Sequence, residues 1–248
     1  MHNSHQGVSS GSPITIASIS SSCADCSMHE LCLPAVVNNA DLDRLESIMS
    51  KRIRVERGDS LYRAGDLFTT LYAVRLGHFK TVYSEGPATK QIIGFQMSGE
   101  ILGMEGIGTA RHRCSSIALE DSEVCEIPYA RLESLLAELP SLQAHFHRMM
   151  SREINREHQV MLLLGSMSAD QRVAAFLLNL SRRYETRGFS PSHFVLRMTR
   201  EDIGNYLGLT IESVSRVFSR FKKNDWIEGS PRDVKLIDRE ALERLCTG

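Results

Sequence analysis

Six cysteines occur in the chain, and three of them lie within ten residues near its beginning. Cys23, Cys26 and Cys32 have the spacing C-x2-C-x5-C, so one short loop can bring three thiolates to a single site. Thiolates bind zinc and the iron atoms of iron–sulfur clusters, and both centres usually take four protein ligands. The spacing therefore predicts a metal centre that needs a fourth ligand from elsewhere. The candidates for it are Cys114, Cys125 and Cys246.

The residue pattern leaves more than one chemistry open for these thiols. Zinc sites more often use two close pairs of cysteines, whereas three clustered cysteines and a distant one favour an iron–sulfur cluster. A zinc-stabilised protein that does not sense oxygen remains the alternative. Cys23 and Cys26 also have the spacing of a thiol–disulfide enzyme, but no strand-to-helix context or positive neighbour is present to activate a thiol. Because no phosphate-binding loop, zinc-protease motif or hydrolase motif occurs either, we expect no enzymatic activity.

A second group of residues, near the end of the chain, has the pattern of a DNA reader. The sequence predicts one helix over 199–207 and another over 210–224, separated by a tight turn at Gly208. Apolar residues can close these two helices on each other, which leaves the polar residues of the second helix outside. A hairpin predicted over 226–238 follows as a wing, so this segment is interpreted as a winged helix-turn-helix.

The polar face of the second helix carries residues suited to base recognition. Glu212, Ser215 and Arg216 share that face, since they are spaced i, i+3 and i+4. Arginine can bind both acceptors of guanine, and glutamate can accept a hydrogen bond from the cytosine amino group. Between positions 172 and 223 ten Lys and Arg outnumber four acids, and this local surplus suits a polyanion. The expected DNA-binding residues are Thr210, Glu212, Ser213, Ser215, Arg216 and Arg220.

Two kinds of element must position these groups. From 52 to 128, short runs of alternating polarity are divided by glycines, which predicts a small antiparallel barrel or roll. From 129 to 165 the pattern is helical, with a break at Pro140 and no Gly or Pro from 142 to 164. A heptad stripe on this long helix predicts a dimer seam. Its members include Met150, Ile154, Glu157, Met161 and Leu164.

This order of elements predicts an α+β protein. We expect a flexible tail over 1–22, a cluster-binding loop and sensor domain over 23–135, a dimerisation helix over 136–166 and a winged helix-turn-helix over 167–248. The composition, 42% hydrophobic and 24% charged with a formal net charge of −1, excludes a disordered chain. No apolar run is long enough to span a membrane, and the first 22 residues lack the positive region of a signal peptide, so a cytoplasmic location is expected.

On these residues the chain resembles the cyclic-AMP receptor protein superfamily and, within it, regulators of the fumarate-and-nitrate-reduction (FNR) type. The resemblance runs from Cys23 to about Leu245. It is most specific over 198–210 (MTREDIGNYLGLT), over 124–128 (VCEIP), in the cysteine group and in the three base-reading residues.

The resemblance implies a β-roll sensor, a long dimerisation helix and a winged helix-turn-helix. It implies that dimers bind TTGAT-N4-ATCAA-type promoter sites under anaerobic conditions and contact RNA polymerase as activators. It further implies that Cys125 is the fourth ligand of a 4Fe-4S cluster, with Cys114 and Cys246 left unassigned. Oxygen is expected to convert such a cluster to a 2Fe-2S or apo form.

The nucleotide-binding members of the same superfamily offer a different effector. The segment 99–103 (GEILG) resembles the start of their phosphate-binding segment. The continuation departs from theirs, because HRCS at 112–115 stands where an Arg-Ser-Ala-like stretch would clamp the phosphate. We interpret this segment as retained scaffold of the roll, although Arg113 could still reach a phosphate.

Glu157 suggests how a cofactor could control dimerisation. Across a two-fold seam the two copies of Glu157 would face each other, and carboxylates about 4 Å apart repel by roughly 1 to 4 kcal/mol. We hypothesise that an intact cluster repositions the long helix so that the dimer forms, and that loss of the cluster returns the monomer. One helix-turn-helix alone gives little specific affinity, whereas two spaced about 34 Å apart recognise an operator.

Overall fold

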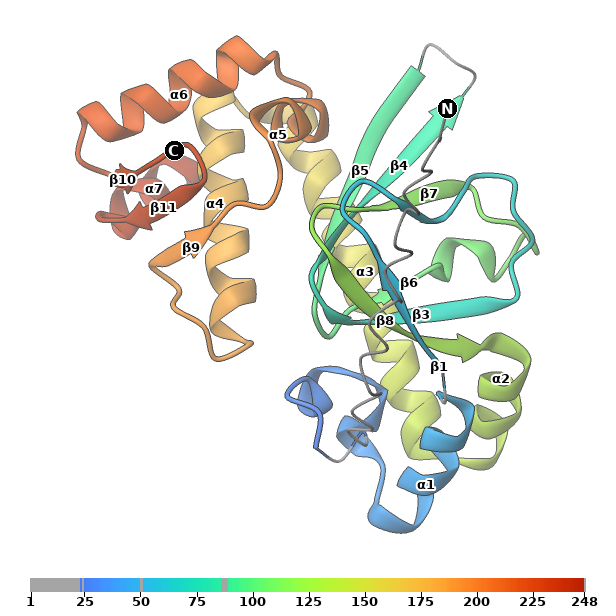
Figure 1. Cartoon of the computed structure of the whole chain (residues 1–248). Helices are drawn as coiled ribbons and strands as arrows, with labels where there is room; N and C mark the ends of the chain where they lie inside the picture. The colour runs from blue at the N-terminus through green and yellow to red at the C-terminus, as the bar shows by residue number, and fades with distance from the viewer. Residues whose placement is uncertain (1–22, 24, 50, 86–88, 248) are drawn as a thin grey trace, which may run out of the picture.

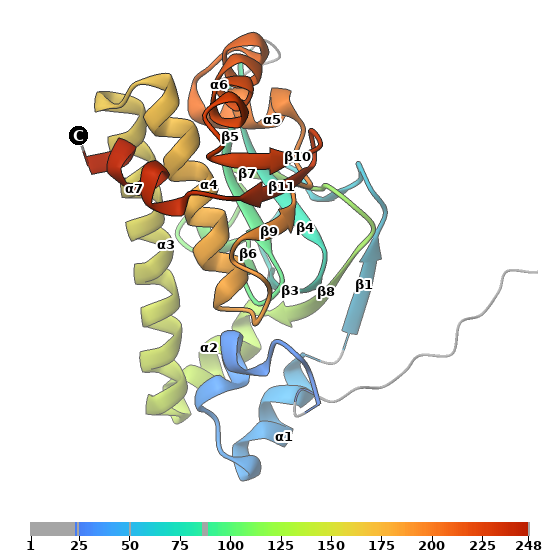
Figure 2. The same ribbon diagram turned by 90° about the vertical axis from the view of Figure 1, so that its left-hand side faces the viewer.

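The computed structural model describes residues 23, 25–49, 51–85 and 89–247, so the tail expected over 1–22 lies outside the described residues. Figure 1 shows N-terminal helices and a β-roll beside a C-terminal lobe. A long helix extends along both parts, and Figure 2 shows it from the side. The expected architecture of roll, long helix and winged helix-turn-helix is confirmed.

The roll consists of two four-stranded antiparallel sheets. Their strand orders are β1-β8-β3-β6 and β2-β7-β4-β5. The last two strands of the region predicted as a roll, β7 and β8, belong to different sheets. The strands are β1 (Lys51–Val55), β2 (Ser60–Tyr62), β3 (Thr70–Leu76), β4 (His78–Glu85), β5 (Thr89–Met97), β6 (Ile101–Leu102), β7 (Cys114–Ala118) and β8 (Ser122–Pro128), with a short helical turn η3 (Met104–Gly106) after β6.

Strand β8 divides its side chains between two cores, as the two-residue period of a strand requires. Val124 packs inside the roll. Cys125 and Ile127 belong to a second core, which the roll shares with the N-terminal loop and helices. The pairing of Cys125 with Arg52 on β1 and with Ala73 on β3 fixes this choice, because a slip by one residue would exchange the two faces.

Helices pack against one end of the roll. Helix α1 (Asn39–Ile48) has no counterpart among the predicted elements, and Asn38 caps it by accepting the Asp41 amide at 2.9 Å. The predicted helical region divides into α2 (Tyr129–Glu138) and α3 (Pro140–Ser166). The break falls at Leu139, one residue before Pro140, because proline is well tolerated in the first turn of a helix.

The C-terminal lobe forms the predicted winged helix-turn-helix. A capping box between Ser168 and Gln171 opens its first helix, and Thr199 and Thr210 cap the next two. A strand before the helix-turn-helix and a final helix are additions that the sequence pattern did not predict. The elements are α4 (Ala169–Glu185), β9 (His193–Val195), α5 (Arg200–Leu207), α6 (Ile211–Lys223), β10 (Ile227–Gly229), β11 (Asp233–Leu236) and α7 (Arg239–Thr247).

Two glycines let α5 and α6 pack closely. Gly208 ends α5 in the left-handed conformation, with φ of 62°, as the sequence predicted. Gly204 lies inside α5, where an added Cβ would stand 2.7 Å from the carbonyl oxygen of Leu209. The turn therefore requires glycine at position 204 as well, and the sequence pattern had not singled it out.

The C-terminal lobe shares a hydrophobic core with the roll. The ring of Phe95 on β5 meets those of Phe176 on α4 and Tyr206 on α5 edge to face, with centroids 6.1 and 5.0 Å apart. The amide of Ile92 also donates to the side-chain oxygen of Asn205 at 2.5 Å. The helix-turn-helix is thus held against β5 by apolar and polar contacts.

We predict that Gly204→Ala lowers the free energy of unfolding by about 1–3 kcal/mol, the usual cost of forcing a group into a filled space. Gly165→Ala is the matched control, because an added Cβ on this α3 residue meets nothing within 4 Å. It should leave stability unchanged or raise it by up to about 1 kcal/mol. Urea unfolding of both variants is the measurement, and equal stability of the two would contradict the close approach at Gly204.

Candidate metal centre and nucleic-acid interface

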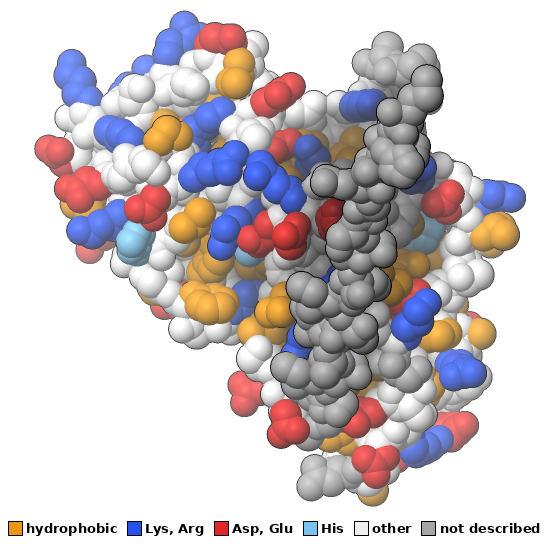
Figure 3. All heavy atoms as spheres, viewed as in Figure 1, with side chains coloured by type: hydrophobic (Ala, Val, Ile, Leu, Met, Phe, Trp, Pro, Cys, Tyr) orange, Lys and Arg blue, Asp and Glu red, His pale blue; other side chains and the backbone are white. Residues whose placement is uncertain are grey.

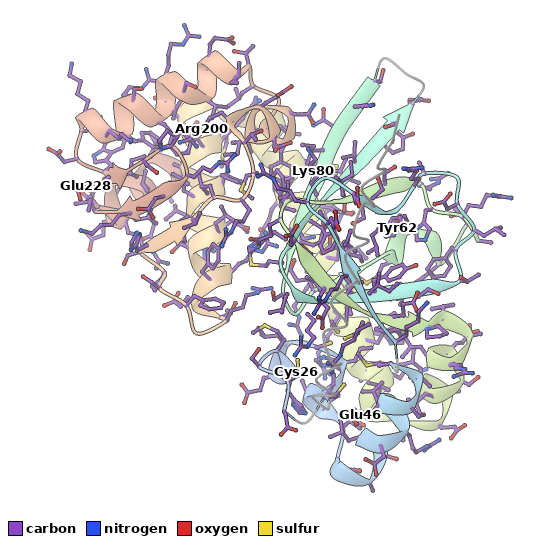
Figure 4. The ribbon with its side chains drawn as sticks, viewed as in Figure 1. Cys26, Glu46, Tyr62, Lys80, Arg200 and Glu228 are labelled. Atoms are coloured by element: carbon purple, nitrogen blue, oxygen red, sulfur yellow. The ribbon has the colours of Figure 1, made fainter. Side chains whose placement is uncertain are left out.

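The cysteine loop is built from consecutive tight turns. Its helical turns are η1 (His29–Leu31) and η2 (Leu33–Val36). The Cys26 amide donates to the Cys23 carbonyl at 3.2 Å, and the Cys32 amide donates to the Met28 carbonyl at 3.1 Å. These turns fold Cys23 and residues 25–32 into a compact loop. Figure 4 shows Cys26 and Glu46 in the same region, between the N-terminal helices and the roll.

The loop cysteines and Cys125 form one group of interacting thiols. Burial raises the pKa of Cys23 to about 12, and Glu46, Cys125 and Cys26 add smaller effects in the same direction. Burial likewise raises the pKa of Cys32 to about 12, with further contributions from the other three cysteines. The structure therefore brings together the four cysteines that the sequence and the resemblance singled out.

Two arginines beside Cys125 were not foreseen. Burial raises the pKa of Cys125, whereas Arg52 and Arg75 lower it. Arg52 lies directly opposite Cys125 in the β1–β8 register, and Arg75 on β3 pairs with Glu123 at 2.8 Å. Positive charge next to the thiol favours its ligating thiolate form. Sequence spacing could not find these residues, because strand register places them.

The remaining two cysteines lie apart from this group. Cys114 is on β7, in the other sheet of the roll, and is buried. Burial raises its pKa to about 12, and the nearby charges are those of Glu105, Glu157 and Arg113. Cys246 is on α7, where its thiol donates to the Gln171 carbonyl at 3.8 Å.

The spacing of the thiols bears on the kind of centre they could form. Within the described part of the chain, no group of three or more His, Cys, Asp or Glu is arranged to hold a metal ion. Four thiolates on one zinc ion lie about 3.8 Å apart, because Zn–S bonds are about 2.3 Å long and tetrahedral. The cysteines of an iron–sulfur cluster bind different iron atoms and stand farther apart. The described thiols therefore do not have the geometry of a single-ion site.

The roll contains a small acidic cavity of about 50 Å³ on the side facing α3. Ordinary ligand pockets measure roughly 300–1,000 Å³. Its charged lining residues are Glu105, Glu153 and Glu157, and Arg113 is exposed instead of pointing into it. A cavity of this size and charge disfavours binding of a cyclic nucleotide phosphate. This supports the interpretation of the segment 99–103 as scaffold of the roll.

Helix α6 presents the predicted base-reading face to solvent. Val214, Val217, Phe218 and Phe221 are buried beneath it. The predicted contact residues Glu212, Ser215, Arg216 and Arg220 are exposed, as is the cap residue Thr210, whereas Ser213 is half-buried.

Polar contacts fix the start of this face. The Thr210 hydroxyl donates to Ser213 at 3.1 Å, and the Arg216 guanidinium donates to the same Ser213 oxygen at 3.3 Å. The backbone amide of Glu212 and then the Thr210 hydroxyl lower the pKa of the Glu212 carboxyl, so it is ionised at neutral pH. Arg220 forms an ion pair with Asp170 at the start of α4. Figure 3 shows several Lys and Arg side chains on the surface of the C-terminal lobe.

The predicted seam residues of α3 divide into two sets. Ile154 and Met161 are 49% and 60% exposed, and Glu157 is exposed as well. Met150 is half-buried against the core beside the N-terminal loop. Leu164 is half-buried and approaches Gly208 of the helix-turn-helix. The middle of α3 therefore keeps large apolar side chains in solvent, as an unpaired dimer helix would.

Comparison with known proteins covers almost all of the chain. It is 46% identical over 223 residues to the transcriptional regulatory protein Btr of Bordetella pertussis, across 90% of this chain and 92% of that protein. It is 41% identical to the fumarate and nitrate reduction regulatory protein of Escherichia coli, across 90% of each chain. The chain belongs to the FNR-type regulators of the cyclic-AMP receptor protein superfamily.

Family models and a solved structure agree with this assignment. Residues 171–245 match the Crp-like helix-turn-helix domain, and residues 52–138 match the cyclic nucleotide-binding domain. The solved structure of FixK2 from Bradyrhizobium japonicum aligns with a TM-score of 0.73 and 28% identity, over 79% of this chain and 96% of that one. Regulators of this family bind DNA and act as dimers, and the relatives are not enzymes. No helix among the described residues is long and apolar enough to cross a membrane.

We predict that Arg216→Ala weakens binding to the specific two-fold site by about 1–3 kcal/mol, the contribution of a bidentate base contact. Binding to random DNA should change little. Lys223→Ala is the control, because the exposed ammonium of Lys223 suits a DNA phosphate. Its loss should weaken binding to both DNAs equally and reduce the number of released counterions by about one. Titrations at several salt concentrations measure this, and equal losses for Arg216→Ala on both DNAs would make Arg216 a phosphate contact.

Proposed function

We propose that this protein is an oxygen-sensing transcription regulator that uses an oxygen-labile iron–sulfur cluster. Cys23, Cys26, Cys32 and Cys125 would hold the cluster, with 4Fe-4S the expected form. The loaded protein forms a homodimer that binds TTGAT-N4-ATCAA-type promoter sites and contacts RNA polymerase under anaerobic conditions. When bound, the cluster supplies a group that oxygen oxidises, which makes its survival a measure of oxygen.

The observation that carries this proposal is the convergence of four thiols from two distant segments. Three come from the loop over 23–32, and the fourth comes from β8 beside Arg52. Buried thiols with a raised pKa are poor nucleophiles, so a thiol–disulfide function is disfavoured. Binding of an inorganic cluster would remove their protons and use the positive charge beside Cys125. The Escherichia coli relative named for fumarate and nitrate reduction supports the same function.

The cysteine loop is joined to the dimerisation helix. Nε2 of His145, on α3, forms a hydrogen bond with the Cys32 carbonyl at 3.2 Å. Leu33, directly after Cys32, is fully buried in the same core as Leu142 and Phe146 of α3. A change in the position of Cys32 must therefore move α3 or break these contacts. This connection supports control of dimerisation by the state of the cysteine loop.

We predict that Cys125→Ser abolishes the brown chromophore and the bound iron and sulfide of protein purified without oxygen. Cys114→Ser and Cys246→Ser should retain them, because these residues lie outside the thiol group. Absorbance spectra with iron and sulfide assays decide the matter. A complete cluster in Cys125→Ser would assign the fourth ligand elsewhere, and bound zinc in colourless wild-type protein would favour the zinc alternative.

We also predict that Glu157→Ala increases the dimer fraction in air. Removing one carboxylate from each helix relieves a repulsion of roughly 1 to 4 kcal/mol across the seam. Glu240→Ala removes the same charge from a site that is 85% exposed on α7, and it should leave the dimer fraction unchanged. Sedimentation velocity of the two variants is the measurement. A wild-type profile for Glu157→Ala would remove this explanation of the switch.

A further inference from the structure

The cysteine loop rests on the turn between β5 and β6. Gly99 in this turn has φ of 87°, and an added Cβ there would lie 2.9 Å from Cβ of Leu31. Leu31 immediately precedes Cys32. The amide of Gly99 donates to the Val74 carbonyl at 2.8 Å, which ties the turn to β3. The loop and the turn are therefore in direct contact, with no room for a side chain between them.

The next residue of the turn, Glu100, pairs with three arginines, two on helices and one just after the end of α4. Its carboxylate lies 2.7 Å from Arg183 and 2.7 Å from Arg187, both in the C-terminal lobe, and 3.2 Å from Arg156 on α3. Burial opposes ionisation of this carboxyl, but the three guanidinium groups lower its pKa to about 2. Glu100 is therefore ionised at neutral pH and binds cations of both the long helix and the DNA-binding part.

The same two arginines of the C-terminal lobe also bind the backbone of this segment. Arg183 donates to the Phe95 carbonyl at 2.7 Å, and Arg187 donates to the Ser98 carbonyl at 2.7 Å. Charged and backbone contacts therefore fix the turn and the end of α4 together. A contiguous network of ion pairs and hydrogen bonds of this kind can carry energetic coupling between distant sites.

We propose that Leu31, Gly99 and Glu100 link the cysteine loop to the DNA-binding domain within one chain, so that Glu100 positions α4 according to the conformation of the loop. This inference rests on the proposed function, since it assigns a second output to the same sensor loop. It is separate from the dimer seam, because none of the three residues belongs to the heptad stripe of α3.

A cavity beside the link gives the loop room to move. It measures about 360 Å³ and is lined by Leu31, Gly99, Glu100, Arg156 and Arg183, among others. Leu31 can therefore shift without displacing a packed neighbour on that side. A shift of Leu31 would release Gly99, and the Glu100 carboxylate would move with the turn.

A second ion pair between the roll and the lobe provides a matched control. Nζ of Lys80 on β4 lies 2.6 Å from the carboxylate of Asp202 on α5. Figure 4 shows Lys80 where the roll faces the C-terminal lobe. This pair joins the same two parts of the molecule but does not include the turn over 98–101. Loss of the Lys80–Asp202 ion pair should weaken the contact between the roll and the lobe. It should not change the coupling between Leu31 and α4.

The first experiment is hydrogen–deuterium exchange on the full-length protein, with and without iron, for Leu31→Ala, Glu100→Gln and Lys80→Gln. Leu31→Ala should speed exchange about threefold or more over 183–189, because release of the turn favours local opening at the end of α4. Glu100→Gln should in turn speed exchange over 29–32. Lys80→Gln should change neither segment. An effect of Leu31→Ala confined to its immediate neighbours, together with no effect of Glu100→Gln over 29–32, would overturn the link.

The second experiment measures specific DNA binding by protein of equal iron content and equal dimer fraction. Leu31→Ala and Glu100→Gln should each weaken binding by about 2- to 30-fold, the range found for mutations that change coupling. The double variant of Leu31→Ala and Glu100→Gln should lose no more DNA affinity than the stronger single variant. By contrast, the losses of affinity caused by Leu31→Ala and Lys80→Gln should add. Additive losses for both pairs would refute the link. Wild-type protein that contains no iron after purification without oxygen would instead refute the proposed function. The hydrogen–deuterium exchange experiment would still test the link from Leu31 to α4 in that case.

Discussion

The register of β8 between β1 and β3 is the constraint on which the sensor depends. A strand turns successive side chains to opposite faces, so one register sends Val124 into the roll and Cys125 toward the N-terminal loop. The same register places Arg52 opposite Cys125. The fourth thiol, its positive neighbour and the core that holds the loop are therefore set by one pattern of backbone hydrogen bonds.

The roll retains the fold of a nucleotide-binding domain while its interior has lost the properties of a nucleotide site. The cavity facing α3 is small and carries three carboxylates. Glu100, in the glycine-flanked segment that resembles a phosphate-binding segment, pairs with three arginines of this chain. The carboxylate that could have faced a ligand thus serves the internal structure. The cysteine loop packs instead against side chains of β3 and β8 on the outside of the roll.

The roll and the C-terminal lobe are held together by contacts of β5 with α4 and α5. Phe95 packs among side chains of α4 and α5, and Asn205 binds the backbone of β5. The recognition helix α6 lies on the side of the lobe away from this contact, as Figures 1 and 2 show. The predicted base-reading residues of α6 are therefore exposed while the lobe packs against the roll.

The sequence by itself determined the elements with local causes. The cysteine spacing, the capping box at Ser168, the turn at Gly208 and the base-reading face of α6 each depend on residues a few positions apart. For this reason the sequence predicted the roll, the long helix and the winged helix-turn-helix in the correct order. Helices α1 and α7 were missed, although Asn38 is a residue type that caps helices and Leu42 and Leu45 have helical spacing.

Only the tertiary structure decided which distant residues meet. The choice among Cys114, Cys125 and Cys246 could not come from spacing, because it depends on the sheet and face to which each residue belongs. Gly204 shows the same limit, since its necessity arises from the approach of Leu209 across a turn. Glu100 meets arginines more than fifty positions away. Such contacts follow from packing and register, which depend on the whole chain at once.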